Sequence, residues 1–398
     1  MLKKITLILA AFIILFFSIS GTSSLLLDFY SNKVADQYHP KLGLEATLKK
    51  SLSLLLNKNS IKKNYLPIFA SCELEDNAPN LVFKNGKSGF FINKIGFGGN
   101  QSIIQFLHMA SMGNTLKGKK VIILVSPFWF NKRGIVPIFF KLSFSELQFY
   151  TYMKNQKLTD DLKIKLCKRI LSIPKDSFNQ FFITLYSYLY LNQKSTFFSI
   201  IFNISKPFYD LKLKILSLKD TFDAYKKLTL LKVSSPISEY SIEKEIIDWN
   251  DFKDYCTTLD KKKSNSKLYC KESYYKWRIK KKTIKKWPIN MTQDSPEYND
   301  FALLLELCKE LEVKPLFISM PVHGFIYDHV AQWYKIDSPT QRQNYYSRIE
   351  KMIGLNNFPL LDLRHHEYTP WFSKTHSQIG KTGWAYINEE IYKFYYKK

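Results

Sequence analysis

The sequence predicts an α/β fold: a parallel sheet flanked by helices, with a helical insertion and an N-terminal transmembrane helix. Residues 119–130, KKVIILVSPFWF, form a continuous apolar run that is typical of a strand buried on both faces. Residues 90–100, FFINKIGFGGN, have the pattern of a strand that ends in glycines before an amphipathic helix, which is the order of elements in a parallel sheet. An uncharged apolar run near the N-terminus indicates the transmembrane helix.

Residues 1–27 are predicted to be a membrane anchor. Lys3 and Lys4 precede an uncharged run, residues 5–27, that is long enough to cross a bilayer. The two lysines predict a cytoplasmic N-terminus, a single pass through the cell membrane and an extracytoplasmic remainder. A cleaved signal peptide is the alternative, since the run contains the small residues of SISGTSS.

The rest of the chain is predicted to consist of a linker and one large domain. Residues 28–63 are expected to form helix and linker, and residues 64–398 an extracytoplasmic domain. Residues 64–134 and 290–398 are expected to form the core of this domain. The strand patterns LPIFAS, KPLFISMPV and FPLLDLR occur there among helical segments. Residues 135–289 are rich in Phe, Tyr, Leu and Lys, and we expect them to form a mainly helical insertion.

Composition and charge restrict the classes of function. With 398 residues, of which 45% are hydrophobic, the chain can bury a sizeable core. Its net charge of +25 indicates a basic surface that attracts polyanions, although a lysine-rich composition without a binding role is an alternative. Five scattered cysteines without CxxC spacing predict neither a metal site nor a disulfide framework, and no cofactor is expected. No nucleic-acid-binding motif is present, so we expect an anionic envelope polymer and not nucleic acid as the partner.

The stretch FASCELEDN, residues 69–77, has the pattern of a nucleophile turn. A strand ends here, and Ala70 leads into Ser71, Cys72 and Glu73, as at the strand-to-helix turns that present nucleophiles in α/β hydrolytic enzymes. A thiol is partly ionised near neutral pH and needs less activation than a hydroxyl, so Cys72 is the main candidate. A small, partly buried and inert cysteine is the alternative.

Four blocks of the chain, by their order and spacing, resemble the signature blocks of the DltD family, the D-alanyl transfer proteins of teichoic acid modification. They are ASCEL (70–74), GFGGNQS (96–102) with LKGKKVIILVSPFWF (116–130), SMPVHGFIYDH (319–329) and IGKTGWAYINEEI (379–391). The resemblance implies an SGNH-hydrolase-like α/β fold outside the membrane and a part in esterifying teichoic acid with D-alanine. The partners it implies are a membrane O-acyltransferase (DltB-like), a D-alanyl carrier system and an anionic teichoic-acid-like polymer.

All three positions of the family's catalytic triad are altered in this sequence. The family's first block usually reads GSSEL with the second Ser as nucleophile, and Cys72 occupies that place. The last block usually reads DxxHxGxxGW, and Thr375 and Gln378 occupy the places of its Asp and His. A Gln amide accepts no proton at a useful pH, and a Thr cannot stabilise an imidazolium, so His376 is the best available base. Phe128 also replaces the Gln of the block that usually reads SPQWF.

Oxyanion donors are expected at the end of the second strand. SGNH-like folds supply them from the nucleophile's backbone N–H, a glycine and a side-chain amide, and the resemblance places the last two among Gly98, Gly99 and Asn100. A plain tight turn is the alternative for the glycines. Ser71 and Glu73 are also counted among the oxyanion and pocket residues. Ser71 is the other candidate at the nucleophile turn, although its side chain is expected to point into the neighbours of its strand, and Glu73 either caps the turn or faces the cleft. Other histidines that follow predicted strands are further candidates for a base: His323, His329, His365 and His366.

The basic, aromatic stretch CKESYYKWRIKKKTIKKWP, residues 270–288, is the candidate polymer-binding segment. Cations interleaved with aromatic rings suit a phosphate polymer or anionic lipid headgroups. The solvated face of an amphipathic helix is the alternative. The residues predicted to hold the polymer are Lys276, Arg278, Lys280, Lys281 and Lys282.

The sequence leaves open whether the protein is an enzyme. In one hypothesis it takes part in D-alanylation with Cys72 as the acyl acceptor and His376 as the base. In the second, a non-catalytic binding protein presents the polymer or a partner to the membrane O-acyltransferase. In the third, it is an O-acyl esterase or transferase that acts on another envelope glycan, because a fold does not name the acceptor. A distance of about 4 Å or less between Cys72 and His376 would support catalysis.

Overall fold

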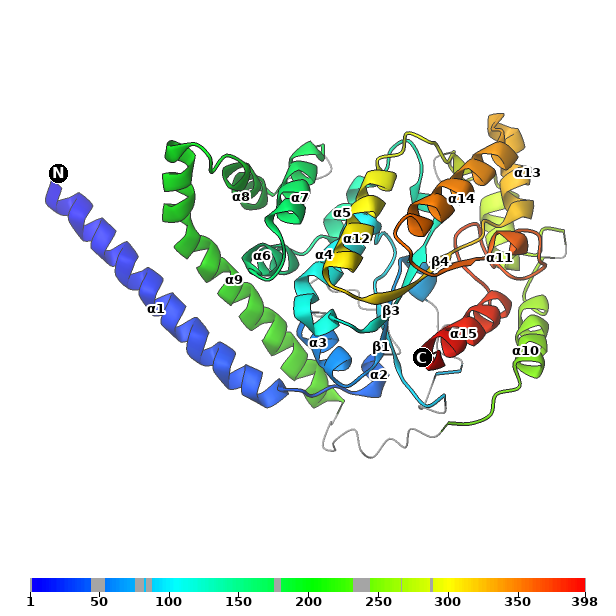
Figure 1. Cartoon of the computed structure of the whole chain (residues 1–398), viewed down its shortest axis with the longest axis horizontal. Coiled ribbons are helices and arrows are strands. Elements are labelled where there is room, and N and C mark those ends of the chain that lie inside the picture. Colours follow the sequence, from blue (N-terminus) through cyan, green and yellow to red (C-terminus); the bar gives the residue numbers. More distant parts are fainter. Residues whose placement is uncertain are drawn as a thin grey trace.

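A parallel β-sheet forms the centre of the protein (Figure 1). The computed structural model describes residues 2–43, 54–75, 82–83, 88–174, 180–231, 244–265, 267–286 and 289–397. Within these residues five strands pair in the order β2-β1-β3-β4-β5, and every pairing is parallel. The strands are β1 (Leu66–Phe69), β2 (Ile92–Ile95), β3 (Lys120–Val125), β4 (Lys314–Ser319) and β5 (Leu360–Asp362). The predicted α/β class with a parallel sheet is confirmed.

Helices cover both faces of this sheet, with α4 and α12 on one side and α15 on the other (Figure 1). Successive side chains of a strand point to opposite faces, so both faces of the central strands need apolar residues. Ile123 and Phe317 accordingly lie in one core, and Ile122 and Ile318 lie in the other. The helices of these two layers and their neighbours are α2 (Pro40–Gly43), α3 (Leu54–Lys62), α4 (Ser102–Met112), α12 (Glu297–Glu310), α13 (Gly324–Tyr334), α14 (Ser338–Gly354) and α15 (Lys381–Tyr396).

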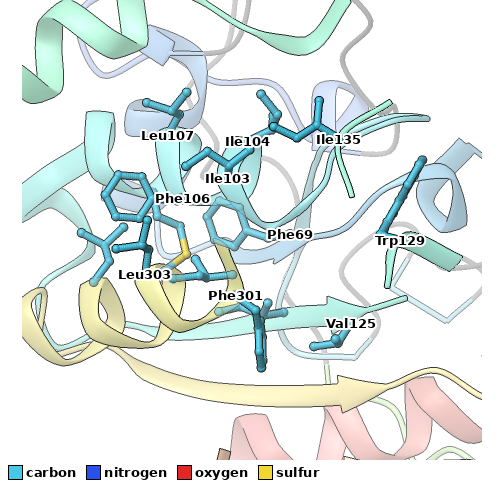
Figure 2. Close-up of a cluster of buried hydrophobic side chains, with 14 of the residues drawn as sticks. Phe69, Ile103, Ile104, Phe106, Leu107, Val125, Trp129, Ile135, Phe301 and Leu303 are labelled. Atoms are coloured by element: carbon cyan, nitrogen blue, oxygen red, sulfur yellow. The ribbon is translucent and has the colours of Figure 1, made fainter. Parts of the chain in front are cut away.

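The larger core lies between the sheet and the helices α4 and α12. Figure 2 shows Phe69 of β1 beside Ile103 and Phe106 of α4, with Phe301 and Leu303 of α12 adjacent. Four of these five side chains are completely buried, and Leu303 is nearly so. Burial of each such side chain stabilises the fold by about 1.5–3 kcal/mol, so this contact fixes α4 and the turn that precedes it.

Between β3 and β4 the described residues are mainly helical, as expected for the insertion. A compact group of helices, α6 to α9, lies beside the α4 layer in Figure 1. The helices of this region are α5 (Pro137–Ser143), α6 (Glu146–Lys154), α7 (Asp160–Ser172), α8 (Phe181–Leu191), α9 (Thr196–Leu230), α10 (Trp249–Lys261) and α11 (Glu272–Tyr274), with a π-helical turn at Tyr275–Ile279.

The N-terminal helix α1 (Leu2–Val34) is longer than the apolar run and continues beyond residue 27. Its last turns pack along α9, where the ring of Tyr30 lies 5.1 Å from that of Phe222. This contact holds the part of α1 that lies in residues 28–63, which were expected to form helix and linker. Its part Ile14–Val34 has the length and apolar composition of a membrane-crossing helix, a test that a signal sequence also passes.

Candidate active site

The carboxyl ends of the parallel strands bring the predicted site segments to one edge of the sheet. Cys72 begins a 3₁₀ turn (Cys72–Glu75) that follows β1, and Gly99 lies in the turn that follows β2. Phe128 lies in the 3₁₀ turn after β3, and His323 follows β4. This is the edge at which open α/β sheets build their sites.

The turn after β1 holds its side chains in three different environments. Cys72 is half-buried, and its Sγ lies 3.8 Å from the carbonyl oxygen of Ser377, within reach of a weak S–H hydrogen bond. The Oγ of the buried Ser71 accepts a hydrogen bond from the Gly99 N–H (3.0 Å), so Ser71 joins β1 to the turn after β2. Glu73 Oε2 accepts from the Ser71 N–H (3.0 Å). Of the two alternatives for Glu73, the structure therefore shows a side chain that folds back onto its own turn.

Replacing Gly99 by alanine is expected to destabilise the protein and to distort this turn. Gly99 has a φ of +101°, and an added Cβ would lie 2.4 Å from Cβ of Phe139. The backbone strain costs about 1–3 kcal/mol, and the contact adds to it because a Cβ moves only with its backbone. Chemical denaturation measures the loss. Gly118→Ala is the matched control, since Gly118 has a φ of +70° but no described atom within 4 Å of an added Cβ. Equal losses would contradict a steric role for Phe139.

Asn100 is completely buried, and its amide contributes to the core. Its Nδ2 lies 3.0 Å from Nε2 of His108, whose Nδ1 lies 2.8 Å from Nε2 of Gln148. Burial lowers the pKa of His108 to about 4, so this ring is neutral and links α4 to α6. In this structure the Asn100 amide and the Gly99 N–H both have partners other than an oxyanion. Their assignment as oxyanion donors, with Gly98, stays a prediction.

Thr375, which the resemblance places at the family's Asp position, shapes the loop that approaches Cys72. Its Oγ1 accepts hydrogen bonds from the N–H groups of Ser377 (3.3 Å) and Gln378 (3.0 Å), which is the usual way a Thr side chain stabilises a tight turn. The turn directs the Ser377 carbonyl toward the Cys72 thiol. Thr375 therefore orders the backbone of the loop and is 8% exposed.

The imidazole of His376 is held by a tyrosine. Nδ1 of His376 lies 2.7 Å from the hydroxyl of Tyr274, and the two rings are stacked with centroids 5.6 Å apart. Removal from water, with a smaller effect of the Arg278 charge, lowers the pKa of His376 to about 4. Burial raises the pKa of Tyr274, so both groups are neutral at neutral pH. The phenol orients the ring, but it carries no negative charge to stabilise an imidazolium.

A pocket of about 500 Å³ opens beside this pair. One wall is apolar and aromatic and includes Phe128, whose ring lies 5.5 Å from that of His376. The pocket also has cationic side chains, and two of them line an adjacent hollow of about 570 Å³. Such a site suits a ligand with an anionic group, because cations pair with phosphate and carboxylate oxygens. These cations are Arg133, Arg278 and Lys285, with Arg133 and Lys285 shared between the two hollows.

The family model for "DltD protein" matches residues 45–396 of this chain. The chain belongs to the DltD family. It is 29% identical over 337 residues to Protein DltD of Bacillus subtilis (strain 168), covering 83% of this chain and 82% of that relative. It is 26% identical over 362 residues to Protein DltD of Staphylococcus aureus (strain NCTC 8325 / PS 47), covering 86% and 83%. Protein DltD of Lacticaseibacillus rhamnosus is 20% identical over 351 residues, covering 85% and 79%. The resemblance to DltD is thus confirmed.

The basic segment of this DltD-family protein lies partly at the pocket. Arg278 lines it beside His376, whereas Lys276 forms an ion pair with Glu272 at 3.4 Å. The ammonium groups of Lys281 and Lys282 lie over the rings of Trp277 (4.5 Å) and Trp333 (5.9 Å), and Lys280 is exposed. All five predicted side chains are exposed. Polymer binding by this segment stays a prediction.

The other candidate histidines of this DltD-family protein lie in different surroundings. His323 is almost fully buried, and burial lowers its pKa to about 4, with the His376 charge acting in the same direction. His366 stacks on Phe372, and its Nδ1 lies 3.1 Å from Thr369 Oγ1. His329 is exposed on α13 and His365 lies against His366. His376 adjoins Ser377, whose carbonyl oxygen lies 3.8 Å from the Cys72 sulfur.

Two residues of this site were missed by sequence reasoning. Tyr274 is 102 positions from its partner His376, and no local pattern indicates that contact. Arg133 follows the third strand closely enough that its position at the carboxyl edge of the sheet could have been predicted. Among the described residues, no group of three or more His, Cys, Asp or Glu side chains could hold a metal ion.

Proposed function

We propose that this DltD-family protein takes part in the extracytoplasmic D-alanylation of teichoic acid or a similar anionic envelope polymer. Family membership supports the reaction, and the cations of the pocket support an anionic polymer as ligand. In this proposal α1 is a single-pass anchor with a cytoplasmic N-terminus, and the rest of the chain is outside the cell membrane. A membrane O-acyltransferase (DltB-like) and a D-alanyl carrier system supply the activated D-alanine.

Cys72 is the proposed acyl acceptor. All five cysteines are free, and Cys72 alone is not buried, at the edge of the sheet where the loop of His376 approaches. The sulfur attacks the carbonyl carbon of the D-alanyl donor, a thioester forms, and the donor's leaving group departs with the thiol proton. A polymer hydroxyl then attacks the thioester, the ester forms, and the proton of that hydroxyl passes to the departing sulfur, which restores the thiol. His376 is the proposed carrier of that proton.

A non-catalytic binding protein is the second candidate, and the chemistry of His376 favours it. A pKa of about 4 makes this imidazole a weak base, and its partner Tyr274 cannot stabilise the charged ring. Phe128 also presents an apolar ring where the family usually has an amide. In this alternative the pocket binds the polymer and presents it to the O-acyltransferase.

Alkylation of the native full-length protein by iodoacetamide separates the two candidates. The other cysteines are inert because they are completely buried, and burial raises the pKa of Cys167 and Cys270 to about 12 and that of Cys256 to about 11. The measured rate therefore reports Cys72, which a Cys72→Ala variant confirms by losing the signal. For a catalytic pair we expect fast alkylation below pH 7 that disappears as the pH falls through about 4, where His376 becomes charged.

Two variants complete this experiment. His376→Gln should slow alkylation of a catalytic Cys72, whereas His329→Gln, which changes an exposed histidine on α13, should not. The binding protein would be supported by slow alkylation whose pH dependence has its midpoint near the pKa of an ordinary thiol, about 8.5. In that case His376→Gln would not change the alkylation rate.

A further inference from the structure

Tyr274 and His376 form a hydrogen bond whose direction follows from their chemistry. The phenol oxygen lies 2.7 Å from Nδ1 of His376, so one of these two atoms donates a proton to the other. A phenol, with an ordinary pKa of about 10, is a far stronger acid than the N–H of a neutral imidazole, and an imidazole nitrogen is a far stronger base than a phenol oxygen. We therefore assign the Tyr274 hydroxyl as the donor and Nδ1 as the acceptor.

The surroundings of the Tyr274 hydroxyl agree with this direction. Nδ1 of His376 is the one acceptor that the described residues offer to this O–H. Burial raises the pKa of Tyr274, and an opposing, smaller effect comes from a hydrogen bond with the backbone of His376. An oxygen that accepts from a backbone N–H keeps its own proton free for Nδ1. The two rings also stack, with an interplanar angle of 18°, which holds the imidazole in one orientation.

The direction of this bond determines which nitrogen of His376 carries the proton. A neutral imidazole has a single N–H, so an accepting Nδ1 leaves the proton on Nε2. Burial and, to a smaller extent, the charge of Arg278 lower the pKa of His376 to about 4, so the ring is neutral at neutral pH. No described residue accepts a hydrogen bond from Nε2. Because the half-buried ring lines the pocket of about 500 Å³, its Nε2–H is a donor available to a ligand there.

The charged side chains around this donor are donors as well. Arg133, Arg278 and Lys285 line the pocket, and Lys132 joins two of them around the adjacent hollow. Among the described residues no Asp or Glu lines either hollow. Such a lining matches a ligand that carries negative charge and only accepts hydrogen bonds, and the phosphodiester group of an anionic polymer is a ligand of this kind.

We propose that Tyr274 holds His376 in the tautomer protonated at Nε2, and that this N–H donates a hydrogen bond to a phosphate oxygen of the polymer in the pocket. Tyr274 is then a positioning residue, and His376 is a binding residue that acts beside the guanidinium of Arg278. The identity of the ligand rests on the proposed function, whereas the tautomer does not. A proton carrier needs the opposite tautomer, with a bare Nε2, so this inference favours the second candidate above, the binding protein.

Nitrogen-15 NMR of the full-length protein in nanodiscs, labelled only in its histidines, tests the tautomer. The His376→Gln variant identifies the resonances of His376 by their disappearance. We expect a protonated Nε2 and an unprotonated Nδ1 from pH 8 down to pH 5, because the ring gains its second proton only near pH 4. A bare Nε2 in the unchanged protein would overturn the proposal and leave the proton carrier standing.

Two variants show whether Tyr274 sets this tautomer. Tyr274→Phe keeps the stacked ring but removes the hydroxyl, so we expect both nitrogen resonances of His376 to move toward the average of the two tautomers. Tyr275→Phe is the matched control, since this neighbouring hydroxyl makes no hydrogen bond to a described residue. It should leave both resonances unchanged. Unchanged resonances in Tyr274→Phe would overturn its positioning role.

Isothermal titration of the same proteins with a glycerol phosphate oligomer tests the ligand. We expect Tyr274→Phe to weaken binding about twofold to tenfold, which is the usual contribution of one hydrogen bond. His376→Leu should weaken binding at least as much, and His376→Gln, whose amide N–H can donate, should retain more of it. Equal affinities of the unchanged protein and His376→Leu would overturn the donor role of the ring.

The pH dependence of binding separates a neutral donor from a charged ring. The ratio of the oligomer affinities of the unchanged protein and His376→Leu should be constant from pH 8 to pH 5, because His376 stays neutral in this range. A ratio that rises as the pH falls through 7 would overturn the neutral donor, since the phosphate would then bind an imidazolium. No binding of the oligomer by the unchanged protein would overturn the polymer as ligand, here and in the proposed function, and the NMR spectrum alone would then decide the tautomer.

Discussion

Cys72→Ala is expected to abolish the transfer of D-alanine to the polymer while the fold is retained. The thiol is the proposed acyl acceptor, and removal of a nucleophile typically lowers a rate by about 10⁴- to 10⁶-fold. The side chain is small and half-buried, so its loss leaves the core intact. The D-alanine ester content of the envelope polymer measures the effect in cells that lack any other DltD protein. The mass of the full-length protein after incubation with a D-alanyl thioester measures the acyl adduct directly.

Cys72→Ser is the control that distinguishes chemistry from shape. A hydroxyl needs a general base far more than a thiol does, and the candidate base has a pKa of about 4 without a carboxylate partner in the described structure. We therefore expect the rate of D-alanine transfer by this variant to fall about 10²- to 10⁴-fold, which is the usual contribution of a general base. Full transfer by both Cys72 variants would contradict an acyl acceptor and leave the binding protein.

A triple variant, Cys72→Ser with Thr375→Asp and Gln378→His, tests whether the frame still suits a serine triad. The Asp can keep the turn, because its carboxylate accepts from the same two N–H groups that Thr375 Oγ1 now binds. Transfer by the triple variant above that of Cys72→Ser alone would show that the loop still presents its side chains to the nucleophile turn.

Arg169→Ala is expected to destabilise the protein by about 3–5 kcal/mol, the usual cost of leaving a buried charge without its partner. The guanidinium of Arg169 on α7 binds both carboxylate oxygens of Asp300 on α12, at 2.6 and 2.8 Å. Asp300 is completely buried, and nearby Glu297 is 1% exposed and accepts from the Ser102 N–H that begins α4. Burial raises the pKa of both carboxyl groups, and the charge of Asp300 raises that of Glu297 further.

Chemical denaturation over a range of pH checks this prediction. Lowering the pH protonates the two carboxyl groups, and a neutral carboxyl group needs no cation beside it. The decrease in the free energy of unfolding caused by Arg169→Ala should therefore become smaller in acid. The double variant Arg169→Leu/Asp300→Leu removes both charges and should lower the free energy of unfolding less than the single change does. A single variant as stable as the double one at every pH would contradict a buried ion pair between insertion and core.

Local sequence patterns predicted most of the sheet. The strands β1, β3 and β4 were apparent as apolar runs, because strands buried on both faces are mainly apolar. The region of β2, which contains the buried polar residues Asn93 and Lys94, was recognised by the glycines that follow it. The run at 119–130 was longer than β3, since Pro127 lacks an N–H for the sheet and begins a 3₁₀ turn. The point at which α1 ends, Val34, could not be predicted in the same way, although helix was expected within residues 28–63. It depends on Tyr30 packing against Phe222, a contact between distant segments.

The sequence predicted which segments of the candidate site lie close together, because the topology of the sheet determines this. It did not predict which side chains contact each other. Parallel strands must end at a common edge, so the approach of the turns after β1 and β2, where Ser71 contacts Gly99, followed from the fold class. The partner of His376 did not follow from the fold class, because either a Tyr or an Asp can occupy that place and only packing decides between them. Asn100 is a similar case, since its amide faces His108 of α4, the helix that follows it.

The pairing of β3 with β4, in which Lys120 lies opposite Lys314, has a consequence for biosynthesis. A chain made from its N-terminus completes β1, β2 and β3 long before β4 exists. Until then β3 has an open edge with unpaired N–H and C=O groups and apolar side chains on both faces, which is a template for aggregation. Pairing across so long a separation is also slow. Cys72 follows β1, whereas His376 follows β5, so the candidate site forms only in the last stage of folding.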